Sequence, residues 1–241
     1  GGISGFTFSP DETKVMYIKK VKSVETIAER HPDLPKATGR VVDDLMYKHW
    51  DHWVEKVPHT FYATIENGKL VNHVDLLEGE PYEAPMKPFG GIESFAWSPD
   101  GSQLVYVSRK TTGMDYALST NSDLYQYDLT TGTTINLTDG MMGYDTNPTF
   151  SPDGNYLAWL SMEHDGYESD KNRIFILNRK TGEKIDLTSE WDYTVNSIVW
   201  NPNSKSLYFV AHHQGVTPIF SIAIKNKEIK IIAEGVCDYA D

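Results

Sequence analysis

The sequence is poor in cysteine, in basic residues and in long apolar runs. Cys237 is the one cysteine among 241 residues, so no disulfide can form within the chain and stability must come from burial and hydrogen bonding. Lysines and arginines number 22 against 34 acidic residues, a formal charge of −12. This charge repels phosphate and no basic cluster offsets it, so we expect no nucleic-acid partner. No apolar run approaches the roughly 18 residues of a membrane span, and the amino terminus lacks the order of a signal peptide, so we expect no membrane segment.

A short motif that recurs four times indicates the fold. In each copy an aromatic-rich strand runs into Ser-Pro-Asp or a close variant, and an alternating strand follows the turn. The motif prolines are Pro10, Pro99, Pro152 and Pro202, spaced by 89, 53 and 50 residues. Proline presets the dihedral of a turn and Asp or Asn bonds back to its amides, so each motif predicts a hairpin. Two further strands complete each repeat, and four antiparallel strands per repeat are typical of a β-propeller blade.

We therefore expect an all-β protein, a partial β-propeller domain over residues 1–241 whose four four-stranded blades are part of a larger propeller, with a helical insertion in the first blade. The long first spacing predicts the insertion at about residues 25–57. The apolar spacing of Val42, Leu45 and Trp53 favours a helix over residues 41–57. The expected blades cover about 3–78, 91–139, 147–189 and 196–234.

Large aromatic residues stand at equivalent positions of the repeats. They are Trp97, Phe150, Trp159 and Trp200. A recurrent aromatic in stacked sheets usually belongs to the core between blades, so we expect a structural role for these four residues.

The repeats carry a family resemblance. The Ser-Pro-Asp-Gly motifs, with trailing Asp-Leu-x-Thr-Gly and Leu-Thr elements, resemble the PD40 or TolB-type propeller repeat. Residues 25–57, with Leu34–Arg40 and Leu45–Trp53, resemble the first-blade insertion of prolyl-oligopeptidase-type (S9) serine peptidases. Together with the loop Glu163–Lys171, they are most similar to the dipeptidyl-peptidase 5 or acylaminoacyl-peptidase-like branch.

The resemblance implies a role within a larger enzyme. In that family a propeller of seven or eight blades caps a carboxy-terminal α/β-hydrolase domain and restricts entry to small peptides. The implied partners are a peptide substrate and that hydrolase domain, with no cofactor, and the implied compartment is the periplasm or the exterior. The chain lacks the Gly-x-Ser-x-Gly of a nucleophile elbow, so we expect no catalytic residue in it. The alternative is a stand-alone TolB-like propeller that binds protein partners, although the 25–57 insertion favours the peptidase.

Three acidic residues are candidates for substrate binding. A dipeptidyl peptidase must hold a free ammonium group, for which a desolvated carboxylate is the usual device. Glu93 precedes a strand of the second repeat, and Glu163 and Glu168 flank the Asp-Gly loop of the third. Each of them either anchors the amine or is a solvated loop charge.

Two further expectations concern a metal and the oligomer. His49 and His52 would share one face of a helix, but a zinc site needs a third ligand, so a packed helix is the preferred interpretation and no metal is expected. Four blades in an open arc expose two apolar faces. The chain is therefore expected either to close into a tight ring or to pair with a second copy as a homodimer.

Overall fold

The computed structural model describes residues 2–45 and 47–239, and most of its regular structure is β-strand. The all-β prediction is therefore confirmed. The chain divides into two compact units, Gly1–Ile92 with Ser108–Ser119, and Glu93–Val107 with Thr120–Asp241.

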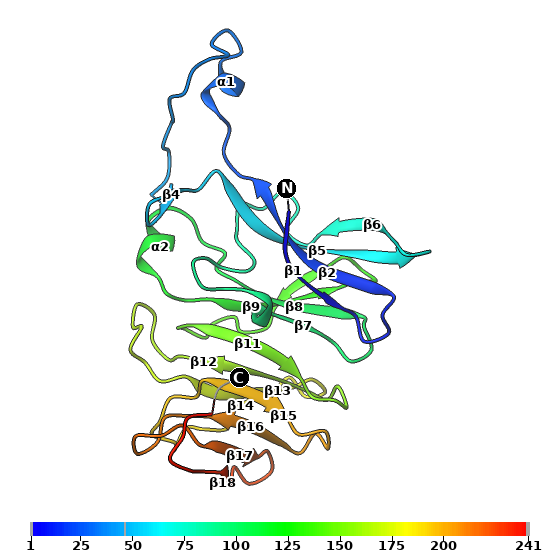
Figure 1. Cartoon of the computed structure of the whole chain (residues 1–241), viewed down its shortest axis with the longest axis vertical. Helices are drawn as coiled ribbons and strands as arrows, with labels where there is room; N and C mark the ends of the chain where they lie inside the picture. The colour runs from blue at the N-terminus through cyan, green and yellow to red at the C-terminus, as the bar shows by residue number, and fades with distance from the viewer. Residues whose placement is uncertain (1, 46, 240–241) are drawn as a thin grey trace. The chain divides into compact units, whose positions relative to one another are not determined.

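One antiparallel sheet organises the first unit (Figure 1). Its strands, in spatial order, are β1 (Ile3–Phe8), β2 (Lys14–Lys22), β5 (Lys56–Glu66) and β6 (Lys69–Asp75). Val15, Tyr17 and Ala63 form its buried core, with Phe61 stacked on Tyr17 at 5.4 Å. The β2–β5 pairing continues to Lys22 opposite Lys56, so a paired ladder closes the base of the segment inserted between these strands.

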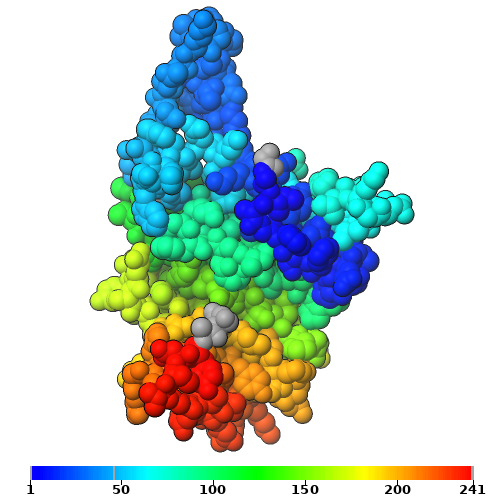
Figure 2. Space-filling view, in the orientation of Figure 1, coloured from blue at the N-terminus to red at the C-terminus, as the bar shows by residue number. Residues whose placement is uncertain are grey.

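The inserted segment, residues 23–45 and 47–55, is called the arm below. It leaves the sheet as a narrow projection, blue in Figure 2. It contains the one-turn helix α1 (Ile27–Arg30) and the short strands β3 (Lys48–His49) and β4 (His52–Trp53).

The expected helix over residues 41–57 is wrong. His49 and His52 are cross-strand partners in the β3–β4 hairpin, whose turn includes Trp50 with a φ of 49°. Val42, Leu45 and Trp53 are all exposed, so the apolar stripe has no core to cover. Because short helices depend on such burial for their stability, the helical spacing alone does not form one here.

The remainder of the first unit leads to helix α2 (Gly113–Leu118), which follows the end of β8. The short 3-10 helix η1 (Ile92–Ser94) spans the point at which the chain passes to the second unit.

The second unit contains three four-stranded antiparallel sheets that follow one another in chain order (Figure 1). The first contains β7 (Phe95–Trp97), β8 (Gln103–Ser108), β9 (Asp123–Asp128) and β10 (Thr134–Asn136). The second contains β11 (Asp145–Phe150), β12 (Tyr156–Ser161), β13 (Arg173–Asn178) and β14 (Lys184–Asp186). The third contains β15 (Ser197–Trp200), β16 (Ser206–Val210), β17 (Ile219–Ala223) and β18 (Ile229–Ala233). Strand β11 packs against β7, β9 and β15, so the middle sheet contacts both of its neighbours.

The repeated Ser-Pro-Asp motif forms the predicted hairpin turns. Ser151 Oγ donates to Asp153 Oδ1 at 2.6 Å and accepts from the Tyr156 amide at 2.9 Å, while Asp153 accepts from the Asn155 amide at 3.0 Å. Ser98 and Asp100 make the same set of contacts in the sheet before it. The motif therefore recurs because one serine and one aspartate satisfy the amides of a tight turn.

Three of the four recurrent aromatic residues are buried, as predicted. Trp159 is buried and donates from Nε1 to Asp145 Oδ1 at 3.1 Å. Trp200 donates from Nε1 to the Thr149 carbonyl at 3.0 Å and thereby ties the third sheet to the second. Phe150 is also buried, whereas Trp97 is half-buried.

Candidate functional site

A cavity of about 680 Å³ lies within the first unit. The arm and the start of β5 form one wall, and residues 81–83, 111–113 and 116 form the other. This volume falls within the range of about 300 to 1,000 Å³ that is usual for small-ligand sites. The cavity is therefore the candidate site of this unit.

A buried carboxylate, that of Glu83, faces this cavity. The residue is 5% exposed. Its Oε1 lies 3.2 Å from His49 Nε2, and its Oε2 accepts from the Tyr116 hydroxyl at 3.2 Å and from the Lys87 amide at 3.1 Å. A carboxylate has about four acceptor positions, so these three contacts leave one for a ligand.

The backbone on both sides of Glu83 is fixed by hydrogen bonds. Ser108 Oγ donates to the Glu83 carbonyl at 2.8 Å, and the Ala84 amide donates to the Pro58 carbonyl at 2.9 Å. Thr60 Oγ1 donates to the Ala84 carbonyl at 2.9 Å. These contacts attach the segment to β5 and to Ser108, both of which belong to the first unit, and so fix the backbone that carries the carboxylate.

The donors to Glu83 come from separate elements. Tyr116 lies on α2, where the Arg109 guanidinium sits 5.0 Å from the centre of its ring and donates to its carbonyl. His49 lies on β3 in the arm. When Glu83 is ionised it only accepts hydrogen bonds, and the shared hydrogen is then on His49 Nε2. The contacts of this carboxylate are thus assembled from three parts of the unit.

The cavity wall is more acidic than basic. Five carboxylate residues line it against two arginines; they are Glu25, Asp43, Asp44, Glu55, Glu83, Arg30 and Arg40. Both arginines are paired with arm acids, Arg30 with Asp43 at 3.2 Å and Arg40 with Glu55 at 2.8 Å. The local field therefore favours a cationic ligand.

The sequence reasoning missed Glu83 and Tyr116. Glu83 stands in a stretch of proline and apolar residues, Pro81 to Met86, and an acidic residue in such surroundings is a signal of burial. Tyr116 offered no comparable signal, because only the folded chain brings α2 to this loop.

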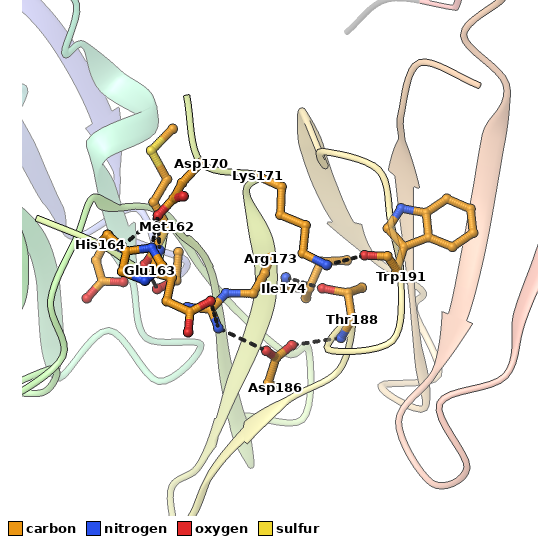
Figure 3. Close-up of polar contacts among 12 residues, drawn as sticks. Met162, Glu163, His164, Asp170, Lys171, Arg173, Ile174, Asp186, Thr188 and Trp191 are labelled. Atoms are coloured by element: carbon orange, nitrogen blue, oxygen red, sulfur yellow. Dashed lines mark hydrogen bonds and ion pairs between the residues drawn. The ribbon is translucent and has the colours of Figure 1, made fainter. Parts of the chain in front are cut away.

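The three predicted substrate-binding residues lie in the second unit and are not among the residues that line the cavity. Glu93 is exposed in η1, and Glu168 is exposed in the loop between β12 and β13. Glu163, in the same loop, is exposed with its Oε2 3.5 Å from Arg173 Nη1, which also pairs with Asp186 (Figure 3). The structure brings Glu163 and Glu168 into one loop without joining them in a site.

The two histidines weighed as metal ligands have different surroundings. His49 faces Glu83, whereas the His52 side chain is 84% exposed and lies 3.3 Å from Asp51. Within residues 2–45 and 47–239, no group of three or more His, Cys, Asp or Glu side chains is arranged to hold a metal ion. In the same ranges no helix has the length and apolar character needed to cross a bilayer.

Comparison with known proteins gives close relatives over the whole chain. It is 53% identical over 241 residues to dipeptidyl-peptidase 5 of Porphyromonas gingivalis, and the match covers 100% of this chain and 35% of that protein. It is 51% identical over 239 residues to dipeptidyl-peptidase 5 of Porphyromonas endodontalis, covering 99% of this chain and 35% of the relative. The chain therefore spans about a third of the length of these relatives.

A solved structure and a family model identify the fold. The acylaminoacyl peptidase of Pyrococcus horikoshii superposes with a TM-score of 0.62 at 14% identity, covering 98% of this chain and 32% of that one. Residues 52–238 match the family model described as PD40, TolB beta propeller domain. The chain belongs to the TolB β-propeller family.

Proposed function

We propose that this chain is the propeller part of a dipeptidyl peptidase and that it gates and positions peptide substrates for a carboxy-terminal α/β-hydrolase domain. The proposal is supported by the identity to two dipeptidyl-peptidase 5 proteins, each matched over 35% of its length. It includes a periplasmic or secreted location and leaves all catalytic residues outside the chain.

The observation that carries the proposal is the buried Glu83 carboxylate, which lines the cavity and accepts three hydrogen bonds where a carboxylate has room for about four. A dipeptidyl peptidase must recognise a free amino terminus, and an ammonium group is a cation with three donors. A charge-assisted hydrogen bond inside a cavity is stronger than one in water, because little solvent competes with it. We therefore assign Glu83 as the group that binds the substrate ammonium.

The same geometry predicts discrimination against peptides with a blocked amino terminus. An acylated amino terminus carries no positive charge, so its binding leaves a buried carboxylate without a counter-charge. Leaving such a group unpaired is more costly than losing a neutral contact. We expect the cavity to reject amino-terminally acylated peptides.

Glu93, Glu163 and Glu168 remain alternative anchors. All three are exposed, and Glu163 already faces an arginine, so solvent or an ion pair weakens their attraction for a ligand. They serve as matched comparisons for Glu83 in the experiment below.

A second function, a stand-alone propeller that binds protein partners, is favoured by one feature of the first unit. Trp50 and Phe89 are 76% and 83% exposed, with ring centres 6.0 Å apart. Exposed aromatic pairs of this kind are frequent in protein interfaces. This function would be favoured by two results together: the full-length protein shows no peptidase activity in the assay described below, and it binds a protein partner that the Trp50→Ala variant no longer binds.

The test uses the full-length protein and two dipeptide substrates with a chromogenic leaving group, one with a free amine and one N-acetylated. Glu83→Gln should raise KM for the free-amine substrate by about ten- to hundredfold, the value of a hydrogen bond to a charged group. The kcat/KM of the Glu83→Gln variant on the acetylated substrate should stay at the wild-type value or rise. If Glu93→Gln, Glu163→Gln or Glu168→Gln raised KM strongly while Glu83→Gln left it unchanged, the ammonium-binding role would belong to that residue and not to Glu83.

A further inference from the structure

The arm is braced internally by contacts between its own residues. Arg30 pairs with Asp43, Arg40 with Glu55, and the Ser23 amide donates to the Glu55 carbonyl at 3.1 Å. The charged groups of Arg40 and Lys48 each lie over the Trp53 ring, 4.3 Å and 4.4 Å from its centre. These contacts link the two sides of the arm to each other.

By contrast, beyond the ion pair of Lys22 with Glu29 at the base, the contacts that join the described residues of the arm to the rest of the first unit are polar or exposed. His49 meets Glu83, the Gly113 amide donates to Asp44 Oδ2 at 3.1 Å, and Trp50 meets Phe89 on the surface. No described residue of the arm is buried. Because burial of apolar area is the main source of stability, this attachment is weak compared with the sheet at its base.

The base of the arm is a suitable pivot. Lys22 pairs with Lys56 at the end of the β2–β5 ladder, and the arm begins and ends beside this pair. A segment that is fixed at one end by a strand ladder and at the other by exposed polar contacts can swing about the ladder when those contacts break.

We propose that the arm is the movable wall of the cavity and that His49 is a positioning residue, which sets the Glu83 carboxylate only when the arm is closed. The inference rests on the proposed function in taking Glu83 as the group that binds the substrate. One of the three donors to this carboxylate travels with the arm, while Tyr116 and the Lys87 amide stay with the body. Opening the arm therefore widens the cavity and releases one side of the carboxylate at the same time.

Two backbone amides report the two parts of the proposal without any substrate. The Gly113 amide is bonded to Asp44 of the arm, so its hydrogen exchange reports whether the arm is closed. The Lys87 amide is bonded to Glu83 Oε2, so its exchange reports whether the carboxylate is in place. Exchange is measured in the full-length protein by mass spectrometry with fragmentation to single residues.

The informative variant is His49→Leu, with His52→Leu as the matched control. Both histidines lie in the β3–β4 hairpin, but only His49 contacts Glu83. Loss of one hydrogen bond of ordinary strength shifts the open population about tenfold. We expect His49→Leu to speed exchange about tenfold at both amides, His52→Leu to change neither, and His49→Gln, which keeps a donor, to restore part of the protection.

The two amides test the movement of the arm and the positioning role of His49 separately. Unchanged exchange at Gly113 in His49→Leu would overturn the movable wall. Faster exchange at Gly113 with unchanged exchange at Lys87 would overturn the positioning role of His49.

Kinetics separate this inference from the proposed function. His49→Leu should raise KM for the free-amine substrate without lowering kcat, and it should add nothing when Glu83 is already Gln. If Glu83→Gln itself leaves KM unchanged, the amine site is wrong, while the exchange at Gly113 still decides whether the arm moves.

Discussion

The buried Asp145 makes the stability of the second unit depend on pH. This aspartate begins β11, is 1% exposed and accepts from Trp159 Nε1. Burial raises the pKa of Asp145 from 3.8 to about 7, and hydrogen bonds from Ser161, Thr138 and Trp159 reduce this effect only in part. The folded protein therefore holds a proton at a pH where the unfolded chain has lost it.

The size of the effect follows from the shift. A rise from 3.8 to about 7 is about three pKa units, and each unit corresponds to about 1.4 kcal/mol of unfolding free energy. Because the folded pKa is the higher one, this contribution of about 4 kcal/mol is fully present below pH ~4 and is lost as the pH rises through ~7. About 2.5 kcal/mol of it should disappear between pH 5 and pH 8.

The assay is the free energy of unfolding in urea at pH 5 and pH 8 for the wild type, Asp145→Asn and Asp139→Asn. Asparagine keeps the acceptor for Trp159 Nε1 but does not titrate, so Asp145→Asn should lack this pH dependence. Asp139 is exposed, so its variant should follow the wild type. If the free energy of unfolding changed by the same amount between pH 5 and pH 8 in the wild type and in Asp145→Asn, burial would not have raised the pKa of Asp145 as described.

Three further predictions concern packing and turns in the second unit. Trp159→Ala should lower unfolding free energy by about 3–5 kcal/mol, with a matching fall in thermal midpoint, whereas Trp50→Ala on the exposed arm should leave the midpoint unchanged. Ser151→Ala should cost about 1 kcal/mol by calorimetry, because the Tyr156 amide loses its acceptor in the turn. Gly143→Ala should cost at least about 2 kcal/mol, since its φ is +101° and a Cβ would lie 2.6 Å from the Met162 carbonyl oxygen. Gly182→Ala, with a φ of +75° and open space around it, should cost only about 1 kcal/mol in the same denaturation series, and equal costs would refute the steric argument.

The hairpin repeat was predictable from sequence because its cause is local. Ser151 and Asp153 satisfy the turn amides within five residues of chain, so the same letters form the same turn wherever they recur. The recurrence of large aromatic residues in the repeats then predicts core positions for Trp159 and Phe150, and both are buried. Each of these signals is complete within a short window of sequence.

The arm and the cavity were decided only by tertiary structure. The spacing of Val42, Leu45 and Trp53 favoured a helix, but a helix of this kind needs a surface to cover, and the fold leaves these residues exposed. Glu93, Glu163 and Glu168 were chosen for their loop positions, and the structure leaves all three exposed. Glu83 became a candidate because the segment that carries it, the arm and α2 meet around one carboxylate, with donors 33 and 34 residues away in sequence. Burial and long-range contact create that site, and neither property belongs to any single segment of the chain.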